Sequence, residues 1–463
     1  MNIDDADMQR FLAAHTAIAE WVGQQPQTRG RTVVDALRDH LGVPPETLGV
    51  VTKEVVAYRF ADYDVALGLM AGEDGQVVGI GGGDQRHHQT LGDMVSTPQY
   101  APPVGQADWA QTPVNAAETR RVLGLGLRLF RFGGQPVAVL QRRMSRMHGN
   151  GQGVLEVICP DADVSNAVIE RATTLATEHS VLRGNVISLE TQGFEAEGDG
   201  YRFLHRPDVA ADQVILPDGV LDRITGHVTG IAQHAEVLRR HGQHLKRGVL
   251  LYGPPGTGKT HTVRHLIGAA TGHTVILLSG ETLELIRPAT AIARHLQPAI
   301  VVLEDCDLVA MDRDYMGGMR PLLFQLLDAL DGLDADADIS FLLTTNRVDV
   351  LEDALTQRPG RVDLAVEIPP PGPRERRRLL ELYRGDIGYS DAVLHEVAGR
   401  SDAHTASFFK ELMRRAVLLA AEEGDDPTDR YLVAALDSLQ ADQDRLSHSL
   451  LGGVTDELDG FVE

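Results

Sequence analysis

The segment at residues 253–260 constrains the fold of this chain more than any other. It reads Gly-Pro-Pro-Gly-Thr-Gly-Lys-Thr and matches the pattern G-x-x-x-x-G-K-[ST]. The apolar run at residues 248–252 before it suits a buried parallel strand, and residues 262–266 after it continue as a helix. Glycines let the backbone wrap closely around an anion, and the N–H groups that open a helix attract phosphate. The segment therefore predicts a strand, a phosphate-binding loop and a helix in succession.

The residue types in this loop each suit the binding of a nucleotide. Lys259 is expected to reach the β- and γ-phosphates, and the hydroxyl of Thr260 is expected to bind magnesium. Lysine is scarce in this chain, with only Lys53, Lys246 and Lys410 elsewhere, so a chance match to the pattern is rare. The predicted nucleotide-binding residues are Gly253, Pro254, Pro255, Gly256, Thr257, Gly258, Lys259, Thr260 and His261.

Two further apolar runs end in polar residues that fit the same chemistry. Residues 299–303 lead into Glu304 and Asp305, and residues 341–344 lead towards Asn346. In P-loop ATPases a carboxylate at this place assists magnesium, and a neighbouring one polarises the attacking water. We therefore expect Glu304 to help to bind magnesium, and Asp305 and Asn346 to act on the water or the γ-phosphate. Taken alone, acidic residues commonly follow strands, and Asn346 would be a simple turn residue.

The N-terminal region shows mixed helix and strand patterns and no motif that indicates chemistry. Residues 1–45 favour helix, residues 48–82 show strand-like alternation, and residues 96–117 have the Pro-, Gln- and Ala-rich composition of a loop or linker. From about residue 215 to about residue 370 strands and helices alternate, which predicts a parallel sheet. Strands are also predicted at residues 122–132, 137–140, 154–158 and 186–189, and a helix at residues 162–180.

These motifs at these spacings resemble the AAA family of P-loop ATPases over about residues 215–440. Asp331-Gly332-Leu333 looks like the inter-subunit signalling segment of that family, and Arg358-Pro-Gly-Arg361-Val-Asp363 resembles its second region of homology. The resemblance implies that Arg358 and Arg361 are arginine fingers, which reach the γ-phosphate bound by a neighbouring subunit. It also implies a ring of identical subunits, most often a hexamer. The alternative for these arginines is a surface turn.

The resemblance completes the predicted architecture. The fold class is α/β, a P-loop NTPase parallel sheet with helices on both faces, plus a C-terminal helical lid and an N-terminal α+β domain. The predicted domains are residues 1–205, an N-terminal α+β region that could bind a client or adaptor; residues 206–370, the AAA core; residues 371–440, the lid; and residues 441–463, an acidic tail.

Two departures from the family pattern bear on function. The family has Asp then Glu at the end of the second strand, whereas this chain has Glu304 then Asp305, which places the water-polarising carboxylate on a shorter arm. Residues 279–298 look shorter than usual and lack the aromatic–hydrophobic–glycine loop that grips a threaded polypeptide. Leu283, Leu285 and Ile286 occupy that region instead.

Three functions compete. The first is an ATPase that uses ATP and Mg²⁺ and couples hydrolysis between ring subunits to the remodelling of an unknown protein client. The second is an ATP-controlled switch or assembly scaffold with slow or no turnover, which the reversed acidic pair and the missing loop favour. The third is a helicase or clamp loader, which the net charge of −23 disfavours because an acidic surface repels nucleic acid. The predicted catalytic residues are Asp305, Glu304, Asn346, Arg358 and Arg361, with Thr260 and Glu304 at the metal.

The same composition argues against a membrane protein. The first ten residues, MNIDDADMQR, are acidic where a secretory signal would be basic, and no apolar run reaches the roughly 18 residues of a membrane helix. We therefore expect a cytoplasmic location and no membrane contact.

Overall fold

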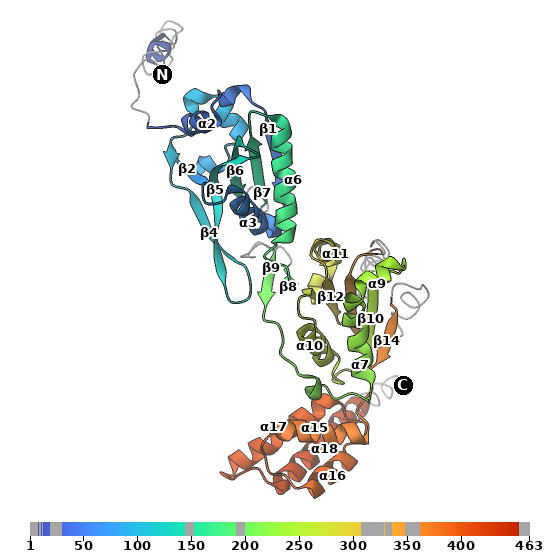
Figure 1. Cartoon of the computed structure of the whole chain (residues 1–463). Helices are drawn as coiled ribbons and strands as arrows, with labels where there is room; N and C mark the ends of the chain where they lie inside the picture. Colours follow the sequence, from blue (N-terminus) through green and yellow to red (C-terminus); the bar gives the residue numbers. More distant parts are fainter. Residues whose placement is uncertain are drawn as a thin grey trace, which may run out of the picture. The chain divides into compact units, whose positions relative to one another are not determined.

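The computed structural model describes residues 8, 11, 13–18, 30–143, 152–190, 200–306, 328, 336–347 and 362–452 (Figure 1). Contacts between residues divide the chain into two compact units. The first consists of Met1–Val114 and Glu118–Val181, and the second of Asn115–Ala117 and Leu182–Glu463.

The first unit is built on an antiparallel sheet of order β1-β7-β6-β5-β2-β3, with β4 also paired to β5. β5 is long enough to pair with β4 along its first half and with β2 along its second half, while β6 covers its other edge. The strands are β1 (Val50–Val55), β2 (Gln76–Ile80), β3 (Val104–Gly105), β4 (Asp108–Pro113), β5 (Thr119–Phe132), β6 (Gln135–Arg143) and β7 (Gly153–Ile158).

Helices cover both faces of this sheet. Alternate residues of β5 and β6 contribute to two separate cores, because successive side chains of a strand point to opposite faces. One core packs α3 and α6 against the sheet, and the other packs α2 and α4. Asp64 of α3 forms a buried ion pair with Arg128 of β5, which ties this helix to the sheet. The helices are α2 (Val33–Leu41), α3 (Phe60–Ala71), α4 (Leu91–Ser96) and α6 (Ala162–Glu178).

Two predictions for this region were wrong in part. Residues 48–82 form strands only at their two ends, and the middle is helix α3. Residues 96–117 contain strand β4, not only a loop or linker, because β4 pairs with β5 from Asp108 to Pro113. Helix α6 and strands β5, β6 and β7 lie where the sequence predicts them.

The second unit contains a seven-stranded sheet of order β14-β10-β13-β12-β11-β8-β9. All its pairings are parallel except that of β9, which runs antiparallel to β8 at one edge. The buried strands are mainly apolar, as expected for a sheet covered on both faces. The strands are β8 (Val186–Leu189), β9 (Tyr201–Leu204), β10 (Arg247–Tyr252), β11 (Thr274–Ser279), β12 (Ala299–Glu304), β13 (Ile339–Thr345) and β14 (Leu364–Glu367).

The predicted boundary after residue 205 does not coincide with the division that the structure shows. β8 and β9 precede that boundary, yet β8 pairs with β11 of the parallel sheet from Val186 to Ser188. The two compact units divide at Val181 and Leu182 instead. The hairpin β8–β9 therefore extends the sheet of the second unit.

Some helices of the second unit pack on the sheet, and the others form a separate bundle. Helices α7 and α10 pack into the same core as β10, β11, β12 and β13, while α11 contacts β11 and β12. Helices α15 to α18 enclose a core of their own, which we call the lid. The helices are α7 (Val220–Thr225), α8 (Ile231–Gln233), α9 (Ala235–Arg240), α10 (Lys259–Ala269), α11 (Ile286–His295), α15 (Pro373–Arg384), α16 (Asp391–Arg400), α17 (Ala406–Glu422) and α18 (Asp429–Gly452).

The last helix corrects the predicted acidic tail. The tail was expected to begin at residue 441, but α18 continues to Gly452, and residues 453–463 lie outside the described part of the chain. Within the described residues, no helix is both long and apolar enough to span a membrane.

Candidate functional site

The predicted phosphate-binding loop joins β10 to α10. β10 lies beside β13, and β13 lies beside β12, so the carboxyl ends of these three parallel strands meet at one edge of the sheet. Lys259, Glu304 and Asn346 each follow or end one of these strands. Ligands of open α/β sheets bind outside this edge. The fold therefore gathers the predicted site residues that the structure describes.

The loop needs glycine at three positions. Gly253, Gly256 and Gly258 have φ angles of 144°, 79° and 110°, a region that favours glycine. A Cβ atom added to Gly253 would lie 2.3 Å from the carbonyl oxygen of Ile368. Gly258 is the residue before α10, so the turn leads directly into the first N–H groups of that helix. This arrangement is the one required for wrapping the backbone around phosphate.

Lys259 is buried and bends back over the loop. Its Nζ donates to the carbonyl oxygen of Gly253 at 2.7 Å and to that of Pro254 at 2.8 Å. These two bonds hold the ammonium group against the backbone at the start of the loop. A positive charge with little solvent around it attracts an anion more strongly than an exposed one.

Thr260 and Glu304, the two predicted magnesium ligands, lie together. Burial raises the pKa of the Glu304 carboxyl, and Asp305 raises it further, whereas Arg264 and a hydrogen bond from the Thr260 hydroxyl lower it. A hydroxyl and a partly desolvated carboxylate are oxygen ligands of the kind that Mg²⁺ prefers. These residues therefore fit a magnesium ion.

Asp305 and Asn346 follow neighbouring strands. Asp305 is exposed, directly after β12, and its φ angle is 54°. Asn346 is half-buried, directly after β13. Both residues therefore lie at the carboxyl edge of the parallel sheet.

The lid touches the loop, a contact that the sequence did not indicate. The backbone N–H of Ser407, at the start of α17, donates to the carbonyl oxygen of Gly256 at 3.1 Å. A Cβ atom added to Gly256 would lie 2.4 Å from Ser407 Oγ and 2.9 Å from Thr405 Oγ1. Because Gly256 and Ser407 are far apart in the chain, only the folded structure identifies Thr405 and Ser407 as neighbours of the loop.

A short extended segment, Val214 to Leu216, joins the parallel sheet to the lid. Val214 and Leu216 are buried in the sheet core, while Ile215 between them packs against the lid core. The residue before it, Gln213, offers its carbonyl oxygen to Nε2 of His261 at 3.1 Å. His261, predicted to bind nucleotide, thus connects the first turn of α10 to this segment.

Other sequence predictions have different outcomes. Arg358, Arg361 and the Asp331-Gly332-Leu333 segment lie outside the described residues. In the region of the missing pore loop, Leu283 and Ile286 are buried. Apolar side chains turned into the core cannot grip a polypeptide, so these two residues are no substitute for an aromatic pore loop.

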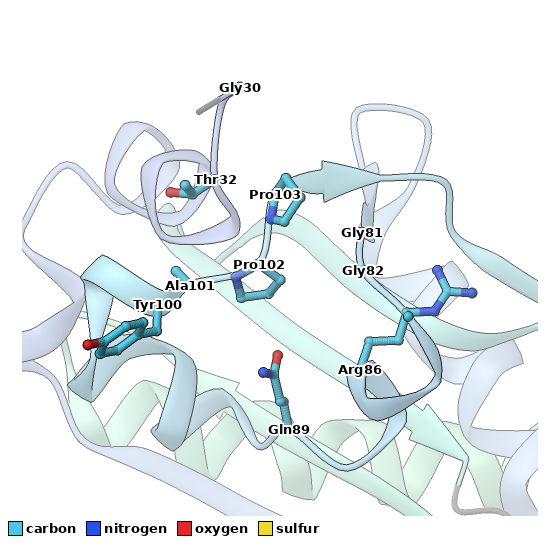
Figure 2. Close-up of a pocket in the computed structure, with 11 residues that line it drawn as sticks. Gly30, Thr32, Gly81, Gly82, Arg86, Gln89, Tyr100, Ala101, Pro102 and Pro103 are labelled. Carbon is cyan, nitrogen blue, oxygen red and sulfur yellow. The ribbon is translucent and has the colours of Figure 1, made fainter. Parts of the chain in front are cut away.

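A second candidate site lies in the first unit. A cavity of about 500 Å³ opens between the turn after β2 and the segment before β3. Figure 2 shows Gln89 directing its amide towards Pro102, with Tyr100 and Arg86 on either side. The Oε1 atom of Gln89 is buried and has no hydrogen-bond partner in the structure. Arg86 is neutralised by Asp108, its ion-pair partner at 2.8 Å.

The parallel sheet, the glycine-lined loop and the lysine across it define a P-loop nucleoside triphosphatase. Residues 249–370 match the sequence profile of the family described as ATPase family associated with various cellular activities (AAA). The chain therefore has an AAA-type ATPase core, and the reaction of this core is ATP hydrolysis.

Comparison with known proteins identifies relatives that extend beyond this domain. Over 293 residues the chain is 29% identical to proteasome-activating nucleotidase 2 of Haloferax volcanii, which covers 60% of this chain and 70% of the relative. A protein of the same name from Halobacterium salinarum is 29% identical, and the matched region covers 62% of this chain and 71% of the length of that relative. The 26S proteasome regulatory subunit 6B homolog of Dictyostelium discoideum is 31% identical, and the matched region covers 44% of this chain and 53% of the length of that relative.

Proposed function

We propose that this protein is a ring-forming AAA motor that couples Mg²⁺-dependent ATP hydrolysis to the remodelling of a protein client. The observation that carries the proposal is the hydrogen bond from Ser407 of the lid to Gly256 of the phosphate-binding loop. Because the loop must hold the phosphates, a change at the γ-phosphate alters the groups that the lid contacts. Hydrolysis can thereby move the lid relative to the sheet.

The proposed site residues divide the chemical work. Lys259 and the loop N–H groups hold the β- and γ-phosphates, and Thr260 and Glu304 hold the magnesium ion. When bound, that ion neutralises charge on the phosphate oxygens. Asp305 polarises the attacking water, and Asn346 orients it. Arg358 and Arg361 of a neighbouring copy stabilise the charge of the transition state, which makes hydrolysis depend on assembly.

Two observations support a protein client. The relatives are a proteasome-activating nucleotidase and a proteasome regulatory subunit by name. The formal charge of −23 gives a surface that repels the phosphate backbone of nucleic acids. We assign the client to the first unit because its cavity combines an exposed tyrosine, Tyr100, with proline walls and a buried amide group.

The cavity suits an uncharged, extended stretch of polypeptide. Its volume lies in the range of ordinary ligand sites, which is roughly 300–1,000 Å³. The amide of Gln89 can bond to a peptide group, and the Arg86–Asp108 pair leaves no net charge for a charged side chain. Binding of a permanently unfolded protein, carboxymethylated α-lactalbumin, should weaken in Tyr100→Ser and Gln89→Ala. It should not change in Val77→Ser, which alters an exposed apolar residue that does not line the cavity.

A switch or assembly scaffold with slow turnover remains the second function, favoured by the buried Leu283 and Ile286 in place of a gripping loop. ATP hydrolysis measured across a protein concentration series separates the two. We expect specific activity to rise with concentration and to be lost in Lys259→Ala, Asp305→Asn and Arg358→Ala. Tight ATP binding with no turnover at any concentration would instead establish the switch.

A further inference from the structure

Asp305 has a backbone conformation that few residues other than glycine adopt. Its φ angle of 54° lies in the left-handed region, where the Cβ atom of an ordinary residue approaches the following carbonyl oxygen. Within the described residues, only Ala403 shares this feature among residues other than glycine. Such conformations persist only where the surrounding structure enforces them, and they gather at functional sites.

The neighbouring strand holds the backbone of this residue at two points. The N–H of Asp305 donates to the side-chain hydroxyl of Thr344 at 3.0 Å, and the N–H of Cys306 donates to the carbonyl oxygen of Thr344 at 2.9 Å. Thr344 is buried in β13 with 1% of its surface exposed, so its hydroxyl cannot move away without losing its place in the core. The turn after β12 is thus fixed to β13 by one backbone bond and one side-chain bond.

The side-chain bond is not needed to build the sheet. β12 and β13 pair from Ala299 to Leu303 through their backbones, and Leu303 already lies opposite Leu343. Any residue at position 344 offers the carbonyl oxygen that Cys306 uses. The threonine hydroxyl also accepts from the N–H of Asp305, which the side chain of valine or alanine cannot do. This bond acts on the residue that carries the reacting carboxylate.

We infer that Thr344 is a positioning residue. Its hydroxyl holds Asp305 in the left-handed conformation, and this conformation directs the carboxylate of the short Asp305 side chain towards the attacking water. In this role Thr344 acts through the backbone of Asp305. The inference rests on the proposed role of Asp305. Without the hydroxyl, residue 305 relaxes towards an ordinary φ angle, and its carboxylate turns away from the γ-phosphate.

The test compares Thr344→Val, Thr344→Ser and Asp305→Asn in ATP hydrolysis, with the Kd for ATP measured separately. Asparagine tolerates the left-handed region as well as aspartate does, so Asp305→Asn removes the charge and keeps the backbone. We expect Thr344→Val to lower kcat about tenfold or more, towards the value of Asp305→Asn, with an unchanged Kd for ATP. Thr344→Ser, which restores the hydroxyl, should stay within about threefold of the wild-type kcat.

Thr274→Val is the matched control. Thr274 is also a buried threonine in a strand of this sheet, and its hydroxyl donates to the carbonyl oxygen of Leu296. Its loss should lower Tm and leave kcat unchanged. Thr344→Ala, which is too small to clash, is measured beside Thr344→Val.

The possible failures are distinguishable. Wild-type kcat in Asp305→Asn would overturn the role of Asp305 and with it this inference. An inactive Asp305→Asn with a fully active Thr344→Val would overturn the inference alone. Unfolding of both Thr344→Val and Thr344→Ala would assign the hydroxyl a structural role only and would overturn it too.

Discussion

The backbone N–H of Ser407 and the carbonyl oxygen of Gly256 lie 3.1 Å apart, which joins the first turn of a lid helix to the middle of the phosphate-binding loop. Neither side chain is needed for this bond. It depends instead on how closely the two backbones approach, and the absence of a Cβ atom at Gly256 allows that approach. The contact is therefore sensitive to a single methyl group.

Gly256→Ala should weaken ATP binding about tenfold or more. The added Cβ would lie 2.4 Å from Ser407 Oγ and 2.9 Å from Thr405 Oγ1, so both side chains must turn away or the lid must shift. Gly242→Ala is the control because Gly242 also has a positive φ, 67°, but no atom within 4 Å of an added Cβ. Both variants should lose about 1–2 kcal/mol of stability from the strained backbone, and only Gly256→Ala should change the Kd for ATP. Equal affinities in the two variants would show that the lid contact is irrelevant to binding.

The buried pair of Arg247 and Asp338 should be essential for folding of the parallel sheet. Arg247 Nη1 lies 2.7 Å from Asp338 Oδ1, at the amino ends of β10 and β13, and Arg247 is 1% exposed. Asp338→Ala leaves the guanidinium buried without its counter-ion, which should cost about 3–5 kcal/mol in denaturant unfolding. Glu411→Ala, which breaks an exposed ion pair with Arg414, should leave the unfolding midpoint unchanged. Similar midpoints for the two variants would contradict this prediction.

Buried His273 should make the second unit sensitive to acid. Burial lowers the pKa of His273 from its ordinary value of 6.5, and the positive charges of Arg247 and Arg206 lower it further. A hydrogen bond with the backbone of Thr271 and the negative charge of Asp338 raise this pKa. The folded unit thus favours the neutral form of this imidazole more than the unfolded chain does. Its contribution to stability is present above about pH 6.5 and is lost as the pH falls through the lowered value. Unfolding followed by circular dichroism should show a smaller loss between pH 7.5 and 5.5 in His273→Leu than in the wild type.

Asp62 should give the first unit the opposite response. Burial raises the pKa of Asp62 to about 6, although Arg59, the N–H of Val181 and the hydroxyl of Ser180 all lower it. The folded state then binds the proton more tightly than the unfolded state, so the contribution of Asp62 falls as the pH rises from about 4 to about 6. The difference in unfolding free energy between wild type and Asp62→Asn should decrease by up to about 3 kcal/mol over that range.

Tryptophan fluorescence can follow this transition separately, because Trp109 lies in β4 of the first unit and residues 182–463 contain no tryptophan. A difference that does not vary with pH would mean that Arg59 keeps the carboxylate ionised throughout. That result would leave the buried ion pair, and not the protonated acid, as the state of the folded protein.

The parallel sheet could be predicted because its strands are short apolar runs, each followed by a recognisable turn. α3 could not, because it is apolar on nearly all sides and carries Asp62 and Asp64 into the core, so it lacks the period of a surface helix. β4 was missed since a sequence such as Asp-Trp-Ala-Gln-Thr-Pro has few strand-forming residues and depends on its pairing with β5.

Some residues of the candidate site could likewise be predicted from the sequence, and others could not. Lys259, Thr260 and Glu304 belong to local motifs, which the sequence shows directly. Thr344 and Ser407 act on residues distant in the chain, and only the folded backbone brings them there. Likewise, the pattern of β8 predicts a strand but not the sheet that it joins, because pairing partners are set by the whole fold.

The segment Val214 to Leu216 has a consequence for how the chain could be lengthened. Its side chains serve the sheet core, the lid core and the sheet core in turn. One residue inserted after Gln213 would exchange these partners, because a shift of one position in an extended chain turns every side chain to the other side. Surface loops generally accept extra residues, but here a change in length of one residue would misdirect apolar groups on both sides at once. The packing of this segment between sheet and lid therefore depends on its length to within a single residue.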